Sequence, residues 1–332
     1  MNQKKDISRW LLVLLSLVIL IVVVGAITRL TQSGLSIVEW NVITGILPPL
    51  NEEQWNIEFD KYKESPEYKI VNQGMKLSDF KTIYFWEYLH RLLARLLGLI
   101  SVIPLIYFII KKKINFNETK ELLAIPLLVG VQGLIGWMMV KSGLDLKTYN
   151  SIGVSHYMLA LHLSLALVTY SIILWNYLKI NNKTLVNSYV YNMNYGFFVF
   201  SMIFVQIILG ALLSGLDAGL ITNNFPDING EFYPSKALVD LSNPYFVHFV
   251  HRWLPIIMML IGFLIFNKIK ANLNQTQKSL FGILVIIFII QMLLGILTVL
   301  TSINILMAIM HQLNAIIMLT VALIISFSFN SK

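Results

Sequence analysis

Six histidines are the residues of this 332-residue sequence best suited to bind a metal or a metal-containing cofactor. They are His90, His156, His162, His248, His251 and His311, and each falls within or at the end of a long apolar stretch. The sequence has no cysteine, which excludes disulfides, thiolate ligands and iron–sulfur clusters. An ionisable side chain inside a membrane costs free energy and usually serves function, although a single histidine could equally donate a hydrogen bond between helices.

The elements that position these histidines are predicted to be membrane-spanning helices. Hydrophobic residues make up 57% of the chain and charged residues 13%, and the mean hydropathy is +0.71. A helix needs roughly 20 mostly apolar residues to span the hydrocarbon. Eight stretches qualify: 10–28, 84–110, 122–140, 152–178, 195–213, 245–266, 280–300 and 304–327. The sequence therefore predicts an all-α integral membrane protein with eight transmembrane helices.

The basic residues cluster in alternate connections, as the positive-inside rule expects. The clusters are Lys4, Lys5 and Arg9; Lys111, Lys112, Lys113 and Lys120; Lys179 and Lys183; and Lys268, Lys270 and Lys278. Both termini are therefore predicted to be cytoplasmic, and the net charge of +8 reflects membrane topology rather than binding to nucleic acid. The first apolar stretch is too long for a secretory signal and no A-x-A site follows it. Without an Arg-rich presequence before it, a bacterial plasma membrane is favoured over a mitochondrial one.

Several short motifs occur twice in the same order, which indicates an internal repeat. Gly25-Ala26 recurs as Gly210-Ala211, His90-Arg91 as His251-Arg252, Gln132 with Gly136 as Gln291 with Gly295, and His162 as His311; the same Gln-x-x-x-Gly spacing occurs at Gln206 and Gly210. We predict two pseudo-repeated four-helix bundles, 1–183 and 184–332, that cross the membrane in the same sense. The long polar loops 31–80 and 214–244 lie on the predicted outer side, where they either cover a site or only shield helix ends.

Four of the histidines follow this repeat and form two predicted pairs. His90 and His162 belong to the first half, and His251 and His311 stand at the equivalent places in the second. All four lie about 10 to 15 Å from the outer ends of their helices at 1.5 Å per residue. Two imidazoles at one level on different helices can bind the iron of a haem from both faces. Zinc is a poorer match, because each pair lacks a third carboxylate or thiolate ligand.

The residues around the paired histidines differ between the halves. Arg91 and Arg252 each follow a predicted ligand and suit haem propionates, unless they extend toward lipid headgroups. Three residues before the histidine, where side chains share a helix face, the first half has Glu87 and the second has His248. A carboxylate beside a haem can transfer protons, so the first half is predicted to hold the reactive site. We interpret His248, together with His156, as pocket or interface residues.

These motifs, taken together and in order, resemble those of the haem A synthases over nearly the whole chain. The matching segments are Gly25–Ile37 (GAITRLTQSGLSI), Glu39-Trp40, Gly45, Pro48-Pro49-Leu50, Trp55, Pro66-Glu67-Tyr68, Trp86–Arg91 (WEYLHR), Gly136–Leu144 (GWMMVKSGL), Gly215–Leu220 (GLDAGL), Phe225-Pro226 and His251-Arg252-Trp253, with His162 and His311 opening the expected segments. One subgroup of the family has cysteine pairs in the outer loops, and this chain has none. Any role of those pairs cannot be transferred to it.

The resemblance implies conversion of haem O to haem A, in which a ring methyl becomes a formyl group through successive hydroxylations and loss of water. The product serves haem-copper terminal oxidases. The resemblance also implies that His251 and His311 bind a resident haem b, that His90 and His162 belong to the haem O substrate site, and that Glu87 is the acidic residue of catalysis. The expected partners are haem O and haem A, the lipid bilayer, an unidentified electron donor and, at the level of the family, haem O synthase and oxidase assembly factors.

Two other functions are compatible with paired histidines. A dihaem membrane cytochrome b that passes electrons between quinol and a partner needs the same two sites, but it has no use for Glu87 or for unequal halves. A transporter or assembly factor that binds haem without changing it is the other alternative. Many transporters place their sites at the midplane of inverted repeats, whereas the repeats predicted here are parallel.

Overall fold

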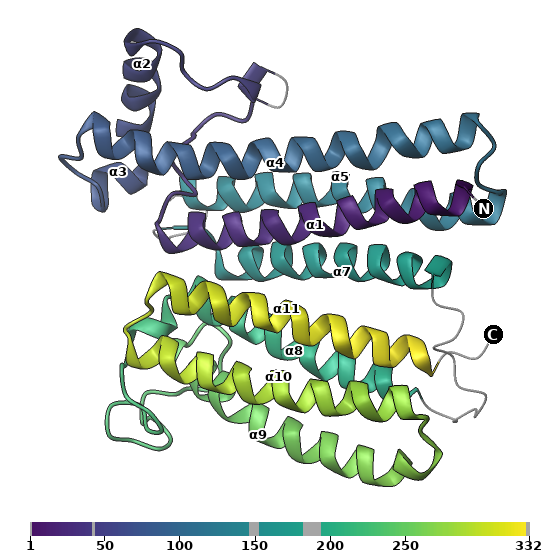
Figure 1. Ribbon diagram of the computed structural model, residues 1–332. Coiled ribbons are helices and arrows are strands. Elements are labelled where there is room, and N and C mark those ends of the chain that lie inside the picture. The colour runs from purple at the N-terminus through teal and green to yellow at the C-terminus, as the bar shows by residue number, and fades with distance from the viewer. Residues whose placement is uncertain (1, 42–43, 146–152, 182–193, 330–332) are drawn as a thin grey trace. The chain divides into compact units, whose positions relative to one another are not determined.

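The computed structural model describes residues 2–41, 44–145, 153–181 and 194–329 (Figure 1). Within these residues eight helices are long and apolar enough to span a membrane. They are α1 (Asn2–Leu30), α4 (Leu77–Ile110), α5 (Phe116–Leu144), α7 (His156–Asn181), α8 (Tyr195–Gly215), α9 (Pro244–Ile269), α10 (Gln275–Leu300) and α11 (Ile305–Ser328). The all-α fold and the eight predicted spans are confirmed.

Most of these helices extend beyond the apolar stretches that the sequence marked, because polar caps close their ends. Asn115 and Glu118 form a capping box at the start of α5, and Asn274 and Gln277 form one at the start of α10. Such reciprocal bonds satisfy backbone N–H groups that have no partner within the helix. Hydropathy locates only the segment that lipid can surround, so it places these helix starts several residues too late.

The chain divides into two compact units, Met1–Ile173 and Leu174–Lys332. The predicted boundary between the halves 1–183 and 184–332 lies outside the described residues, so that division stays a prediction. In the first unit α1, α4, α5 and the part of α7 up to Ile173 run side by side (Figure 1). The indole of Trp10 on α1 donates a hydrogen bond to the carbonyl of Ile100 on α4 at 2.7 Å and packs edge-on against Phe108. These contacts fix α1 against α4.

One end of the first unit carries short helices that the sequence analysis missed within the predicted loop 31–80. They are η1 (Thr44–Ile46), α2 (Glu52–Lys63) and α3 (Pro66–Ile70), and α2 and α3 lie at the end of α4 opposite the N-terminus (Figure 1). Asn51 and Ser65 cap α2 and α3 through their side chains. An aromatic cluster of Phe59, Tyr62, Phe80 and Tyr84 packs them against α4. A hydropathy profile detects only long apolar stretches, so it does not predict such short polar helices.

Glu67 of α3 is a buried carboxyl beneath this cluster. Its side chain is 8% exposed and accepts a hydrogen bond of 3.0 Å from the hydroxyl of Tyr62, which in turn accepts one of 2.7 Å from the amide of Asn72. Burial raises the pKa of Glu67 from 4.5 to about 7, against the lowering effect of the bond from Tyr62. The same burial, reinforced by the charge of Glu67, raises the pKa of Tyr62.

We expect Glu67→Gln to flatten the pH dependence of stability. Because the pKa of Glu67 is raised in the folded state, the stability that its protonated carboxyl contributes is fully present below pH 4.5. This stability is lost as pH rises through about 7. Glutamine cannot ionise, so the variant does not lose this stability. Between pH 5 and 8 its free energy of unfolding should rise relative to that of the wild type by an amount on the order of 3 kcal/mol. Thermal unfolding in detergent at several pH values measures this gain. Exposed Glu64 supplies the control Glu64→Gln; parallel wild-type and Glu67→Gln curves would contradict the expectation.

In the second unit α8 packs against α9 and α11, and α10 packs against α11 (Figure 1). The helices α8 and α11 cross closely at Gly196, where an added Cβ would lie 2.6 Å from the Cα of Ser326. The amide of Asn194 donates to the carbonyl of Ser326 at 3.1 Å in the same region. The loop between α8 and α9 contains η2 (Ala218–Leu220), and η3 (Lys270–Asn272) follows α9.

Candidate haem sites

Each of the four paired histidines lies against a glycine of the neighbouring helix. A Cβ added at the glycine would meet the Cε1 atom of the imidazole at 3.0 Å for Gly25 and His90, 2.9 Å for Gly136 and His162, 2.9 Å for Gly210 and His251, and 3.0 Å for Gly295 and His311. Any other residue at these positions would displace the ring, since real Cβ contacts are almost never this short. The glycines repeated in the sequence therefore make room for the four imidazoles.

The second pair has the spacing that a haem requires. The ring centres of His251 and His311 are 6.4 Å apart, and the planes are inclined at 77°. An imidazole nitrogen binds a metal at about 2 Å, so two imidazoles on opposite faces of a haem have ring centres about 6 Å apart. Among the described residues no cluster of three or more His, Asp or Glu side chains could hold a metal.

Glutamines contact three of the four histidines, a role that the Gln-x-x-x-Gly spacing did not reveal. The amide nitrogen of Gln132 lies 2.9 Å from the carbonyl oxygen and 3.1 Å from Nδ1 of His162. Gln206 contacts His251 in the same way, at 2.8 and 3.0 Å. Gln291 lies 3.3 Å from Nε2 of His311. Each glutamine stands one helical turn before the glycine that receives the imidazole.

Glu87 is buried on α4, three residues before His90; its predicted place beside a haem stays a prediction. Its side chain is 3% exposed. One carboxylate oxygen accepts hydrogen bonds from the hydroxyl of Ser36 at 2.7 Å and the backbone N–H of Ile37 at 2.8 Å. The other pairs with the guanidinium of Arg91 at 2.6 Å. The carboxylate is therefore held in one position by α4 and by the segment that follows α1.

Both arginines that follow a predicted ligand bind backbone carbonyls of a loop. Arg91 donates to the carbonyls of Ile37 at 2.8 Å and Glu39 at 2.9 Å. The predicted role of both arginines with haem propionates stays a prediction, but the structure shows that each side chain anchors a loop to its own helix.

Arg252 repeats this arrangement in the second unit. It donates to the carbonyls of Pro226 at 3.1 Å and Asp227 at 2.6 Å. Its second nitrogen lies 3.0 Å from Nε2 of His248, where Arg91 instead meets Glu87. His248 is 2% exposed. Glu87 and His248, the residues by which the two halves differ in sequence, thus occupy the same position relative to Arg91 and Arg252.

His156, the sixth histidine, begins α7. Its ring centre lies 4.0 Å from that of Tyr157.

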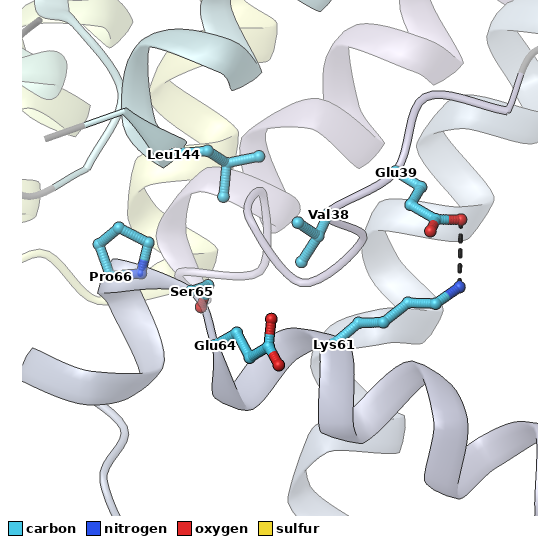
Figure 2. Close-up of a pocket in the computed structure, with 7 residues that line it drawn as sticks. All are labelled: Val38, Glu39, Lys61, Glu64, Ser65, Pro66 and Leu144. Carbon is cyan, nitrogen blue, oxygen red and sulfur yellow. Dashed lines mark ion pairs between the residues drawn. The ribbon is translucent and has the colours of Figure 1, made fainter. Parts of the chain in front are cut away.

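Two adjoining cavities lie at the loop end of the first unit. The larger has a volume of about 350 Å³ and is lined by Val38, Glu39, Lys61, Glu64, Ser65, Pro66 and Leu144 (Figure 2). The smaller, about 90 Å³, shares three of these residues and is also lined by Trp40, Arg91, Trp137, Val140 and Lys141. An ion pair of 3.1 Å joins Lys61 and Glu39 across the larger one (Figure 2), and the bond from Lys61 lowers the pKa of Glu39. Sequence reasoning missed Lys61, because nothing in its spacing connects it with the histidines, and it noted Lys141 only as part of the segment Gly136–Leu144.

We expect Gly210→Ala to weaken haem binding in the second unit. The added methyl would lie 2.9 Å from Cε1 of His251 and would push the imidazole from its position, at a cost of about tenfold or more in affinity. The haem-to-protein ratio after purification in detergent measures the effect. Gly262→Ala is the matched control, because a Cβ there would meet nothing within 4 Å. Equal haem content in the two variants would show that the close approach does not matter.

The fold defines the class: a polytopic α-helical membrane protein in which four imidazoles each lie against a glycine of the neighbouring helix. The family model COX15-CtaA, described as cytochrome oxidase assembly protein, matches residues 8–323. The chain therefore belongs to the COX15-CtaA family.

Bacterial relatives cover most of the chain. A protein of Pelagibacter ubique (strain HTCC1062) named Heme A synthase is 43% identical over 278 residues, which cover 80% of this chain and 81% of the relative. Proteins of the same name from Rickettsia bellii (strain RML369-C) and Rickettsia africae (strain ESF-5) are 45% identical over 260 residues and 41% identical over 297 residues. These alignments cover 75% and 86% of this chain, and 76% and 87% of the relatives.

Proposed function

We propose that the protein is a haem A synthase, an oxidoreductase that converts a methyl group of haem O to a formyl group by successive hydroxylations and loss of water. Family membership and similarity over most of the chain support this function. The structural observation that carries the proposal is the carboxylate of Glu87 at the position where the second unit has His248. An electron-transfer protein with two equivalent haems has no need of this difference.

The two histidine pairs take different parts in this proposal. His90 and His162 hold haem O as the substrate, and His251 and His311 hold a resident haem b. The fit rests on the 6.4 Å ring separation of the second pair and on the glycine contact shared by all four rings. When bound, haem b supplies one-electron redox chemistry next to the protein's own residues.

In this proposal the residues around the first pair position the substrate and transfer protons during its oxidation. Glu87 is dry and tied to Ser36, Ile37 and Arg91, so it can hold or pass a proton without moving. Arg91 and Arg252 keep their loops over the sites, and each remains a candidate partner for a haem propionate. In the first unit α2 and α3, packed on α4 through the aromatic cluster, limit the access of water from the loop end.

The setting of the reaction follows from the predicted topology. The two halves would be parallel repeats, with cytoplasmic termini and with haem sites toward the outer face of a bacterial plasma membrane. Haem A would leave for haem-copper oxidases, and electrons would come from a donor still to be identified. Haem O synthase and oxidase assembly factors are the proposed protein partners.

Haem extraction tests the function directly. The protein is expressed in a bacterial host that makes haem O but no haem A, purified in detergent, and its extracted haems are identified by chromatography and mass. Haem A or its hydroxylated precursor, absent from an empty-vector control, would support the proposal. Unmodified haem b with reversible redox spectra, in cells shown to contain haem O and a competent reductant, would favour a dihaem cytochrome b instead.

A further inference from the structure

Two arginines one turn apart on α4 hold the segment that follows α1. Arg91 binds it through two carbonyls, and Nη2 of Arg95 donates to the carbonyl of Asn41 at 2.8 Å. Gly45 lies against the same guanidinium, since a Cβ there would come 3.0 Å from Nη2 of Arg95. Because Arg95 lies one turn beyond Arg91 toward Ile110, the chain runs along α4 between these contacts.

The segment then returns toward the start of α4, where the hydroxyl of Tyr88 donates to the carbonyl of Ile46 at 2.7 Å. We call residues 37–41 and 44–50 the α4-bound segment; its short helix η1 lies beside α4 on the side away from α1 (Figure 1). Tyr88 and Arg95 continue a stripe of exposed apolar residues at helical spacing. The stripe consists of Leu99, Ile103, Ile106 and Ile110, which are 57, 61, 49 and 70% exposed. The segment therefore lies on the helix face that is exposed further along α4.

The length of α4 places this segment near one boundary of the hydrocarbon. The helix has 34 residues and is about 51 Å long at 1.5 Å per residue, whereas the hydrocarbon is about 30 Å thick, or about 20 residues. Three lysines at 111–113 follow α4 and mark the opposite boundary. Counting about 20 residues back from Ile110 reaches Arg91. Because helix side chains point toward the start of their helix, the guanidinium of Arg95 lies near the same level.

The side chains that this segment exposes are mainly apolar. Trp40 is 41% exposed, Ile46 46%, Leu47 68% and Leu50 71%. The ring of Trp40 lies 5.2 Å from the guanidinium carbon of Arg91. Tryptophan is enriched at the boundary between hydrocarbon and headgroups, and contiguous exposed apolar side chains mark membrane or protein contacts. The bonds from α4 pair backbone carbonyls of the segment, which irregular backbone near the hydrocarbon requires.

The second unit has an isoleucine where the first has Arg95. Arg252 binds carbonyls of its loop as Arg91 does. Five residues after the histidine of the repeated His-Arg pair, however, the first unit has Arg95 and the second has Ile256, which is 41% exposed. The arginine thus accompanies the segment that turns back along α4.

We propose that the α4-bound segment lies in the membrane boundary at the loop end of the first unit, where its exposed apolar side chains contact phospholipid, and that Arg91 and Arg95 hold it there. Lipid is the occupant because the segment continues the exposed stripe of α4 at the level where the hydrocarbon ends. The carboxylate of Glu39 in this segment is paired with Lys61 and lines the cavity. The proposal depends on the membrane-spanning helices and not on the proposed function.

A fluorophore at a single introduced cysteine tests the proposal, because the chain has no cysteine of its own. The full-length protein carries NBD at Leu47→Cys in phosphatidylcholine vesicles, with nitroxide-labelled phospholipid or with iodide on both sides of the membrane as quencher. We expect the lipid to quench NBD and iodide to have little effect, as at Leu99→Cys on the exposed stripe. Ile57→Cys on α2, 49% exposed, is the matched control and should respond mainly to iodide.

Iodide quenching at Leu47→Cys as strong as at Ile57→Cys would show that the segment lies in water and would overturn the proposal. Protection from both quenchers would also overturn it, because a protein surface such as a second copy would then cover the segment. Arg95→Ile gives α4 the residue of the second unit and should raise iodide quenching at Leu47→Cys. Lys120→Ile, near the start of α5, removes a cation elsewhere and should not. Equal quenching in these two variants would refute the anchoring role of Arg95.

Discussion

His251→Ala is expected to abolish binding of the resident haem. Removing a group that only orients a metal-binding histidine costs about 10- to 100-fold in affinity, and removing the histidine should cost more. The ring of His311, 6.4 Å away, would be left as the only axial ligand. The protein purified without a haem O supply should therefore lose nearly all of its haem, as measured by the haem-to-protein ratio and by the reduced-minus-oxidised spectrum.

His248→Gln is the matched control for this experiment. His248 stands on the same helix three residues earlier, and its Nε2 lies 3.0 Å from Arg252. Glutamine keeps an acceptor for that arginine, so the control should retain its haem. Adding imidazole to His251→Gly should restore part of the bound haem if the lost group acted as a ligand. A His251→Ala protein with wild-type haem content, or haem loss confined to the His248 variant, would refute the assignment.

The sequence predicted the spanning helices well because hydropathy and span length are local properties. It also predicted the burial of Glu87 beside His90, because residues three apart on a helix share a face. The repeat singled out Gly210 and Gly295 without saying what they do. Their contacts with His251 and His311 depend on the packing of two helices, which no single helix pattern contains.

What the sequence did not predict depends on residues far apart in the chain. Arg91 donates to the carbonyls of Ile37 and Glu39, more than 50 positions away in the chain, whereas its position in the sequence suggested only a haem propionate or a lipid headgroup as a partner. The helices α2 and α3 were read as loop, since Phe59 and Tyr62 of α2 are buried against Tyr68 of α3 and Phe80 of α4. Every residue has a backbone carbonyl, so a hydrogen bond from a side chain to a loop carbonyl has no sequence pattern. Such bonds can be identified only in the structure.

Glu87→Gln is expected to leave haem binding intact and to slow formation of haem A by about 10²- to 10⁴-fold, the range for removal of a general acid or base. Glutamine has the shape of glutamate and keeps an oxygen that can accept from Ser36 and from the N–H of Ile37, the bonds that hold the native carboxylate at 2.7 and 2.8 Å. It cannot take up a proton at neutral pH. Extracted haems from cells supplied with haem O measure the yield.

The loss of charge beside Arg91 separates a catalytic role from a structural one. Arg91 keeps the carbonyls of Ile37 and Glu39 in the variant, so the loop should stay anchored and the unfolding temperature should change little. Glu39→Gln removes a carboxylate that is 48% exposed and paired with Lys61, and this control should make haem A normally. Full haem A yield from Glu87→Gln would remove Glu87 from the mechanism. A fall in haem content parallel to the fall in yield would instead assign it a structural role, because only a catalytic carboxylate lowers turnover while both haems remain bound.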